Sequence, residues 1–181
     1  DVRWRTSAGT ATMHERTLVV RSANPSDVSQ VSATADATTT SATDVAVSGI
    51  TLTPGAGDYL IWFSGSVEGN TAATTQYVSL YVNGAQIPHT EREVYTEASI
   101  LNTSFPVMFQ ARVTGVLAAQ AIDVRWRTTG GTATMHERTL VVQKITPADV
   151  SEASATADTT TTSATDVQVS GMTLTPGAGD Y

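Results

Sequence analysis

The sequence predicts an all-β protein, an antiparallel β-sandwich built as tandem repeats of 122 residues. Three observations lead to this prediction. Apolar residues alternate with polar ones over short stretches, turn signals separate those stretches, and a long segment occurs twice. Roughly eight to ten short strands in about 105 residues are typical of a sandwich.

The repeat sets the organisation of the chain. Residues 1–59 recur as residues 123–181 at a constant offset of 122, and 47 of the 59 positions are identical. Seven of the 12 differences fall within residues 21–31 of the first copy. Packed positions tolerate change less than connectors do, because a dense core registers even one methylene. The variable stretch is therefore predicted to be a connector.

Five segments follow from this placement of the connector. We expect C-terminal strands of a preceding repeat at 1–23, a linker at 24–40, one complete domain at 41–145, a second linker at 146–162, and N-terminal strands of a following repeat at 163–181. Since both ends then fall inside domains, the chain is expected to be a window from a longer tandem array.

Individual strands are indicated by period-2 alternation. Ile122, Val124 and Trp126 alternate with polar residues, which places Trp126 in the core. The strand around 78–82 runs into Asn83-Gly84, the strongest short-range signal for a tight hairpin. The run 59–63 is apolar on both faces, as expected of a central strand.

Helix signals are confined to two equivalent stretches. Asn24-Pro25-Ser26-Asp27 and its copy Thr146-Pro147-Ala148-Asp149 each place a capping residue before Pro, with an acid two residues after the Pro. This pattern predicts one short helical turn in each copy.

Composition excludes several classes of protein. Ten Lys and Arg against 17 Asp and Glu give a net charge of −7, without the basic stripe that binds nucleic acid. No apolar run approaches the roughly 18 residues of a membrane span. The absence of cysteine excludes a disulfide framework, a thiolate zinc site and a catalytic thiol.

Four stretches together resemble tumour-necrosis-factor-like jelly rolls, including the complement globular-head domains. Residues 57–63 and 78–84 are similar to the middle of that family, and residues 117–124 and 138–142 to its closing half. The resemblance covers one unit, 41–145. It implies a jelly-roll fold and a non-enzymatic binding or structural module, often trimeric. The tandem arrangement departs from the family, and no functional residue is carried over.

Two groups of residues are candidates for facing a ligand. His89, Glu91 and Glu93 share one face if this stretch is extended, a spacing that suits metal ligands or simply an exposed polar face. Arg125 and Arg127 share one face of their strand, suited to a glycan or an anion, or to ion pairs with cross-strand carboxylates.

No catalytic constellation is evident in the sequence. Ser64-Gly65-Ser66 is not a nucleophile elbow, and Thr129-Gly130-Gly131-Thr132 has no following Lys or helix to bind phosphate. We therefore expect no enzymatic activity, no cofactor and no metal.

One invariant stretch lies inside the variable connector. Ser154, Ala155, Thr156, Ala157 and Asp158 repeat residues 32–36 without change, although their neighbours differ between the copies. This stretch is the candidate contact between units.

These observations favour a structural repeat unit of a long extracellular or virion-associated fibre. Strand or linker exchange between neighbouring units stays open as a variant of this hypothesis. The expected partner is the protein itself. The alternative is an adhesin or phage receptor-binding module, whose loops at 71–75 and 91–103 bind a surface glycan or a protein. Both hypotheses place the protein at a cell surface or on a virion.

Overall fold

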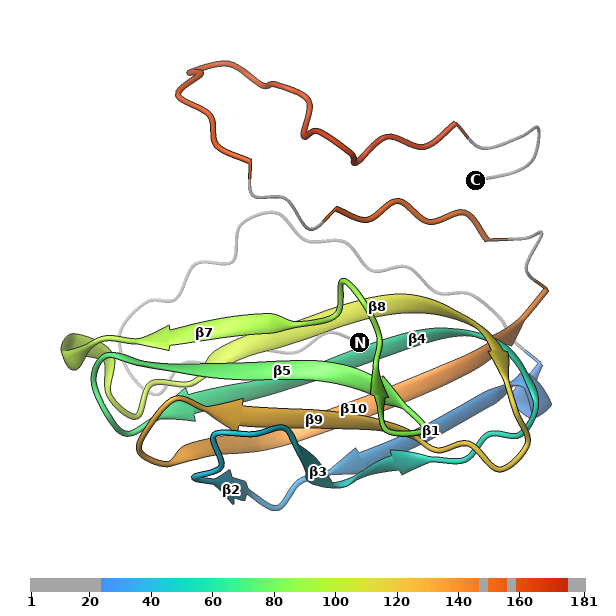
Figure 1. The fold of residues 1–181 in the computed structure, drawn as a ribbon, viewed down its shortest axis with the longest axis horizontal. Helices are drawn as coiled ribbons and strands as arrows, with labels where there is room; N and C mark the ends of the chain where they lie inside the picture. The colour runs from blue at the N-terminus through green and yellow to red at the C-terminus, as the bar shows by residue number, and fades with distance from the viewer. Residues whose placement is uncertain (1–23, 147–149, 156–158, 176–181) are drawn as a thin grey trace, which may run out of the picture.

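A computed structural model describes residues 24–146, 150–155 and 159–175, in which two antiparallel sheets pack face to face (Figure 1). Sheet A has the strand order β1-β10-β4-β8, and β2 also pairs with β10. Sheet B has the order β3-β9-β5-β6, and β7 also pairs with β5. The predicted antiparallel β-sandwich is confirmed.

The described elements are η1 Pro25–Asp27, β1 Val28–Ala33, β2 Ala37–Thr39, β3 Val45–Leu52, β4 Gly57–Gly69, β5 Thr74–Val82, β6 Ala85–Gln86, β7 Arg92–Thr96, η2 Ala98–Ile100, β8 Phe105–Val116, β9 Ile122–Thr128 and β10 Ala133–Ile145.

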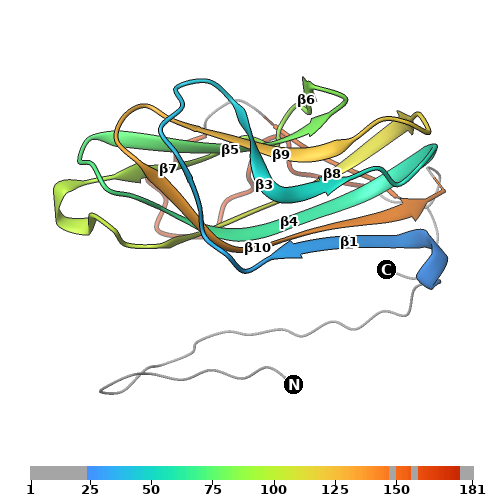
Figure 2. The same ribbon diagram turned by 90° about the horizontal axis from the view of Figure 1, so that it is seen from below.

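The connectivity is that of a jelly roll. From β3 onward the long strands alternate between sheets, with β3, β5 and β9 in sheet B and β4, β8 and β10 in sheet A. Figure 2 shows β3, β9 and β5 in one layer and β4, β10 and β1 in the other.

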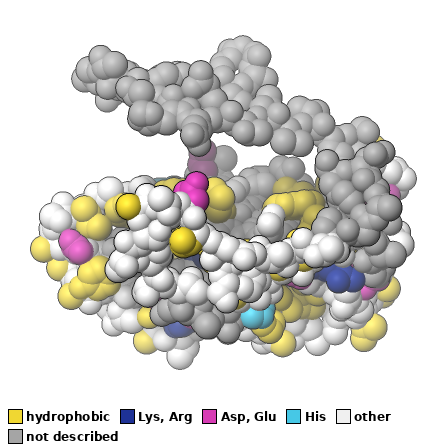
Figure 3. Space-filling model, turned by 90° about the horizontal axis from the view of Figure 1, so that it is seen from above, with side chains coloured by type: hydrophobic (Ala, Val, Ile, Leu, Met, Phe, Trp, Pro, Cys, Tyr) yellow, Lys and Arg dark blue, Asp and Glu magenta, His cyan; other side chains and the backbone are white. Residues whose placement is uncertain are grey.

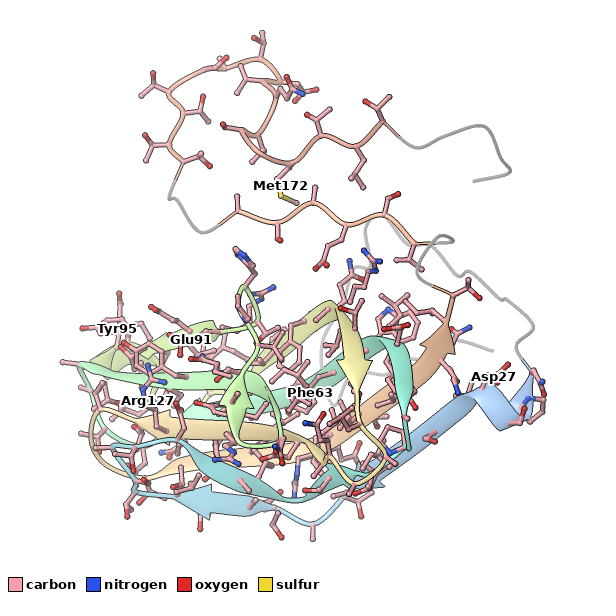
Figure 4. The ribbon with its side chains drawn as sticks, turned by 45° about the vertical axis from the view of Figure 1, so that its right-hand side comes forward. Asp27, Phe63, Glu91, Tyr95, Arg127 and Met172 are labelled. Atoms are coloured by element: carbon pink, nitrogen blue, oxygen red, sulfur yellow. The ribbon has the colours of Figure 1, made fainter. Side chains whose placement is uncertain are left out.

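Side chains from both sheets fill the space between the layers. Trp126 is 2% exposed, which confirms its predicted place in the core. Phe63 of β4 stacks on Phe109 of β8 with ring centroids 5.0 Å apart, and Figure 4 shows Phe63 inside the sandwich. Ile50, Leu80, Met135 and Leu140 are fully buried around them.

The structure contains both the predicted tight hairpin and the predicted central strand. Asn83 and Gly84 have φ of +49° and +80° and join Val82 to its partner Ala85, so the tight hairpin is confirmed. The run 59–63 lies in β4, between β10 and β8, as a central strand should. Its outward-facing Leu60 and Trp62 are only half-buried, because the described residues cover sheet A incompletely on that side.

Residues predicted as a linker between 24 and 40 instead form η1, β1 and β2. β1 is an edge strand that pairs only with β10 among the described strands, and all its residues are half-buried or exposed. Small polar and β-branched side chains suit such an edge. The variability of this stretch therefore reflects its position at a sheet edge.

The sandwich begins and ends one repeat period apart. Asn24 caps η1 through its side-chain oxygen, which accepts from the Ser26 N–H at 3.3 Å, as the capping pattern predicts. β10 ends at Ile145, and Asn24 through Ile145 is 122 residues. The described sandwich therefore spans one whole period of the sequence repeat.

The chain enters and leaves the sandwich at the same end. Val28, the first residue of β1, pairs with Gln143 near the end of β10, and Figure 1 shows η1 beside the tip of β10. We call this the terminal end; it also carries the turn at 53–56 and the loop at 117–121. The opposite, distal end carries the loops at 70–73, 97–104 and 129–132.

The C-terminal segment repeats the sequence of β1 to β3 but forms no strand in its described residues, 150–155 and 159–175. Val169 and Met172 are 54% and 55% exposed, whereas their first-copy equivalents Val47 and Ile50 are 1% and 0% exposed. Met172 lies outside the sandwich (Figure 4). In the complete unit, the corresponding strand β3 pairs with β9, which the segment does not do.

Arg138 is the buried cation of the described sandwich. Its Nη1 donates to the carbonyl oxygens of Ala35 and His136 at 2.8 and 2.9 Å, and its Nη2 donates to that of Ser48 at 2.7 Å. Burial lowers the pKa of Arg138. This side chain thereby joins β10 to the β1–β2 connection and to β3.

Replacing Arg138 with leucine is expected to lower the free energy of unfolding by about 2–4 kcal/mol, because it leaves buried carbonyl oxygens without donors. Denaturant unfolding of the whole chain measures this change. The exposed neighbour Glu137→Gln is the matched control and should change stability by less than about 0.5 kcal/mol. Equal effects of the two substitutions would contradict the role of Arg138.

Candidate functional site

A cluster of charged and aromatic side chains lies on the outer face of sheet B. The Arg127 Nη1 lies 3.0 Å from Asp44 Oδ1 and 2.9 Å from Glu91 Oε2. Its guanidinium also lies over the Tyr77 ring, 3.9 Å from the centroid. Arg127 thus holds together strand β9, the segment before β3 and the segment before β7. Figure 4 shows Arg127 and Glu91 on this side.

Arg125 forms a second stacked pair beside the first. Its Nε lies 2.7 Å from Asp123 Oδ2, and its guanidinium lies 4.5 Å from the centroid of the Tyr81 ring. The Tyr81 hydroxyl donates to Asp44 Oδ2 at 2.6 Å. Asp44 therefore connects the two halves, and we call the whole group the sheet B cluster.

Strand register creates this arrangement. Tyr77 pairs with Arg127 on β9 and with Glu93 on β7, while Tyr81 pairs with Asp123. Directly opposed residues in antiparallel strands share a face, and residues two apart on one strand do so as well. Glu93 accordingly belongs to the same face.

The contacts shift two pKa values. Burial, followed by the hydrogen bond to Asp44, raises the pKa of Tyr81 to about 12. Burial alone would lower the pKa of Arg127, but the hydrogen bonds to Glu91 and Asp44 outweigh it and raise that pKa. Both groups therefore keep their protons at neutral pH.

Four of the five predicted ligand-facing residues meet here. Arg125, Arg127, Glu91 and Glu93 share the face, whereas His89 lies in a turn with φ of +64° and lines a groove beside sheet A. The described residues contain no group of three or more His, Cys, Asp or Glu close enough to hold a metal ion.

Sequence reasoning missed Tyr77, Tyr81 and Asp44. The two tyrosines alternate along a strand that was predicted, so their common face was available from the sequence. Their stacking on Arg127 and Arg125 required the register of β5 against β9, which no local pattern specifies.

The cluster satisfies its own charges. Each arginine already has a carboxylate partner, so an anionic ligand would have to displace Asp44, Glu91 or Asp123. The Ser79 hydroxyl between the tyrosines is buried without a hydrogen-bond partner. The predicted cross-strand pairing holds for Arg127, whose partners Asp44 and Glu91 lie on other segments, whereas Arg125 pairs with Asp123 of its own strand.

A groove of about 500 Å³ lies on the outer face of sheet A. Trp62, Val141 and the 65% exposed Met108 line it, together with Arg92. A neighbouring groove, lined by Leu60 and His89, lies against residues 150–155. In Figure 3, the visible hydrophobic side chains are scattered among uncharged ones, and charged side chains are few.

The invariant stretch at 32–36 contacts another invariant stretch, 135–139, on β10. The hydroxyls of Ser32 and Thr139 lie 3.0 Å apart, Arg138 donates to the Ala35 carbonyl, and Asp36 Oδ1 lies 2.9 Å from His136 Nδ1. Contact within one unit explains why both stretches are unchanged between the copies. The predicted inter-unit contact at 154–158 stays a prediction, and its residues 156–158 lie outside the described part of the chain.

His136 lies between two carboxylates. Besides the contact with Asp36, its Nε2 lies 3.3 Å from Glu68 Oε2. The hydrogen bond to Asp36 is the largest cause that raises the pKa of His136, and burial opposes it. The imidazolium thereby joins the β1–β2 connection to β10 and β4.

Comparison with known proteins finds no matching family model and no matching curated protein. Several solved structures match. The VP2 subviral particle of infectious bursal disease virus has 14% identity and a TM-score of 0.41, over 65% of this chain and 32% of that chain. The C-terminal domain of EclA, a sugar-binding protein, has 15% identity and a TM-score of 0.31, over 70% and 84%. Dimeric latent PorU from Porphyromonas gingivalis has 13% identity and a TM-score of 0.37, over 60% and 10%.

The matched region spans about a third of the VP2 chain. The assignment to the tumour-necrosis-factor-like family is not confirmed. No helix in the described residues is long and apolar enough to cross a membrane.

The raised pKa of His136 predicts a pH-dependent contribution to stability. Protonated His136 stabilises the fold, so its contribution is complete below its ordinary pKa of 6.5 and is lost as the pH rises through the folded value. His136→Gln should therefore be destabilising at pH 5.5 and nearly neutral at pH 9, as measured by denaturant unfolding. His89→Gln, at an exposed turn, is the control. A destabilisation by His136→Gln that grows with pH would contradict the assignment.

Proposed function

We propose that this chain is part of a tandem array of β-sandwich units that forms a structural fibre outside the cell or on a virion. The observation that carries the proposal is the match between the sandwich, Asn24 through Ile145, and the sequence period of 122 residues. A unit that fills its period can be repeated without any added linker.

The exposed C-terminal segment supports this proposal. Its apolar residues Val169 and Met172 match positions that are buried in the complete unit. Leaving large apolar side chains in water forgoes roughly 1.5–3 kcal/mol for each. Their burial would stabilise a second unit, once the remaining strands of that unit cover them.

The expected partner is therefore the protein itself. Near-identical units present near-identical surfaces, and a contact between unlike surfaces of identical units propagates into a filament. The net negative charge keeps such an array soluble. An extracellular or virion location suits a fibre that lacks cysteine and carries a net negative charge.

Strand exchange between neighbouring units is a variant of the proposal. Residues 150–155 repeat β1 at four of six positions, but Ala153 stands where β1 has the half-buried Val31. β1 of the same unit already pairs with the edge of β10, so a strand from another unit can pair there only after β1 dissociates. Both features favour each β1 in its own unit.

The direct experiment completes the second unit. Because Tyr181 matches Tyr59, the chain is lengthened by a second copy of residues 60–145. Two folded units of equal size are expected, as counted by single-molecule unfolding steps. A lengthened chain that shows only one folded unit would refute the array.

Matched substitutions sharpen this test. Met172→Asp should leave the unfolding of the present chain unchanged, because the side chain is exposed. In the lengthened chain the same substitution should abolish the second unit and leave the first intact. Ile50→Asp, at the equivalent position, should abolish the first unit in both chains, since it places a charge in the core.

Recognition through the distal end is the second candidate function. Leu101 lies in the distal loop 97–104, and Tyr95 lies in β7 just before that loop. Tyr95 is 53% exposed and Leu101 is 40% exposed, and exposed apolar side chains of this kind suit contact with a glycan or protein. The single-copy loops 70–73 and 97–104 lie beside them.

Glycan-array binding by the intact chain tests this second candidate. Binding should weaken at least tenfold with Tyr95→Ala and stay unchanged with Met108→Ala, which removes an exposed apolar side chain from sheet A. Absence of binding to any glycan, or equal losses for both variants, would remove the glycan version of this candidate.

A further inference from the structure

The path of the chain through the sandwich constrains how units join. Val28 and Gln143 are direct partners in antiparallel strands, so their Cα atoms lie about 4.5–5.5 Å apart. The chain therefore enters and leaves a unit at nearly one point, on the terminal end. In Figure 2, η1 and the end of β10 meet on the same side of the molecule.

The connection to a following unit is short. Only Thr146 through Asp149 separate the end of β10 from Val150, the copy of Val28. The equivalent residues Asn24 through Asp27 close a single turn, in which the Asp27 N–H donates to the Asn24 carbonyl at 2.9 Å. Even fully extended, the five steps from residue 145 to residue 150 span about 17 Å.

The terminal end presents an apolar loop beside this junction. Leu117 is 63% exposed, and Ala118 and Ala119 next to it are exposed as well. The loop follows β8, whose last residue Val116 pairs with Gly57 of β4. The next residue of β4, Asp58, pairs with Ile145 at the end of β10. Leu117 thus lies two strands away from the point at which the chain leaves.

We propose that consecutive units meet terminal end to terminal end, with the Leu117–Ala119 loop packed on the neighbouring unit, so that the units project from a common spine. This proposal rests on the proposed tandem array. The partner is the following unit of the same chain, because a connector of four residues brings its terminal end to this loop. The distal ends, with their single-copy loops, then point outward.

The advance per unit along the fibre differs between this arrangement and one in which units are joined end to end along the strand direction. β10 has 13 residues, so a unit is about 43 Å long in the strand direction at roughly 3.3 Å per residue. Four strands side by side span only about 15 Å between outer strand axes at a spacing of roughly 4.8 Å. The spine therefore advances by the width of a unit instead of its length.

Spin-label distances in the lengthened chain test the proposal. The protein has no cysteine, so Ala118→Cys and the same change in the second unit label the two terminal-end loops alone. A second sample carries Ala72→Cys in both units, at the distal end. The Ala118 pair is expected within about 25 Å, as two surfaces in contact require, and the Ala72 pair farther apart.

An Ala118 distance equal to or longer than the Ala72 distance overturns the proposal. This outcome is distinct from failure of the array, in which no second folded unit appears. Leu117→Asp should at least double the width of the Ala118 distance distribution without changing the stability of either unit. Met108→Asp, at a side chain exposed to the same extent on sheet A, is the control and should leave the width unchanged. Equal widths for both variants overturn the loop contact.

Discussion

The pairing of β1 with β10 is the constraint on which the rest of this molecule depends. It adds β1 to sheet A beside β10, and it fixes the first and last strands of the unit side by side. From it follow the length of the unit, the position of both chain connections at the terminal end, and the contact between the two invariant stretches. A repeat that began at any other strand would place its junction elsewhere and would present a different surface to its neighbour.

Polar contacts hold this pairing in register. Arg138, at a bulge of β10, reaches carbonyl oxygens of the β1–β2 connection and of β3, and His136 on the same bulge reaches Asp36 and Glu68. Both side chains belong to the invariant stretch 135–139, and their partners include the invariant stretch 32–36. Such contacts specify one arrangement, because an unpaired buried charge is costly. The sheet B cluster fastens the opposite face in the same way, through Arg127 and Asp44.

Much of the fold was predictable from the sequence, and the reasons are local. Period-2 alternation identified the strand that contains Trp126, a run apolar on both faces identified the strand that contains Phe63, and Asn83-Gly84 identified the tight hairpin. The error concerned β1, because the edge strand Val-Ser-Gln-Val-Ser-Ala has neither the regular apolar alternation nor the burial that marks a strand. The candidate site was predictable in part. Arg125 and Arg127 were found from their shared face, but Asp44 and Glu91 contact Arg127 across 83 and 36 residues of sequence, which only the tertiary structure brings together.

The central claim is that the unit of the repeat is the stretch from Asn24 to Ile145. Unfolding of two shortened chains, residues 24–145 and residues 41–145, measures it directly against the whole protein. The account predicts that residues 24–145 unfold in one cooperative transition as stable as that of the full chain. It also predicts that residues 41–145, which lack β1 and β2, lose several kcal/mol or fail to fold. Equal stability of the two shortened chains would contradict the account, because it would show that β1 is dispensable.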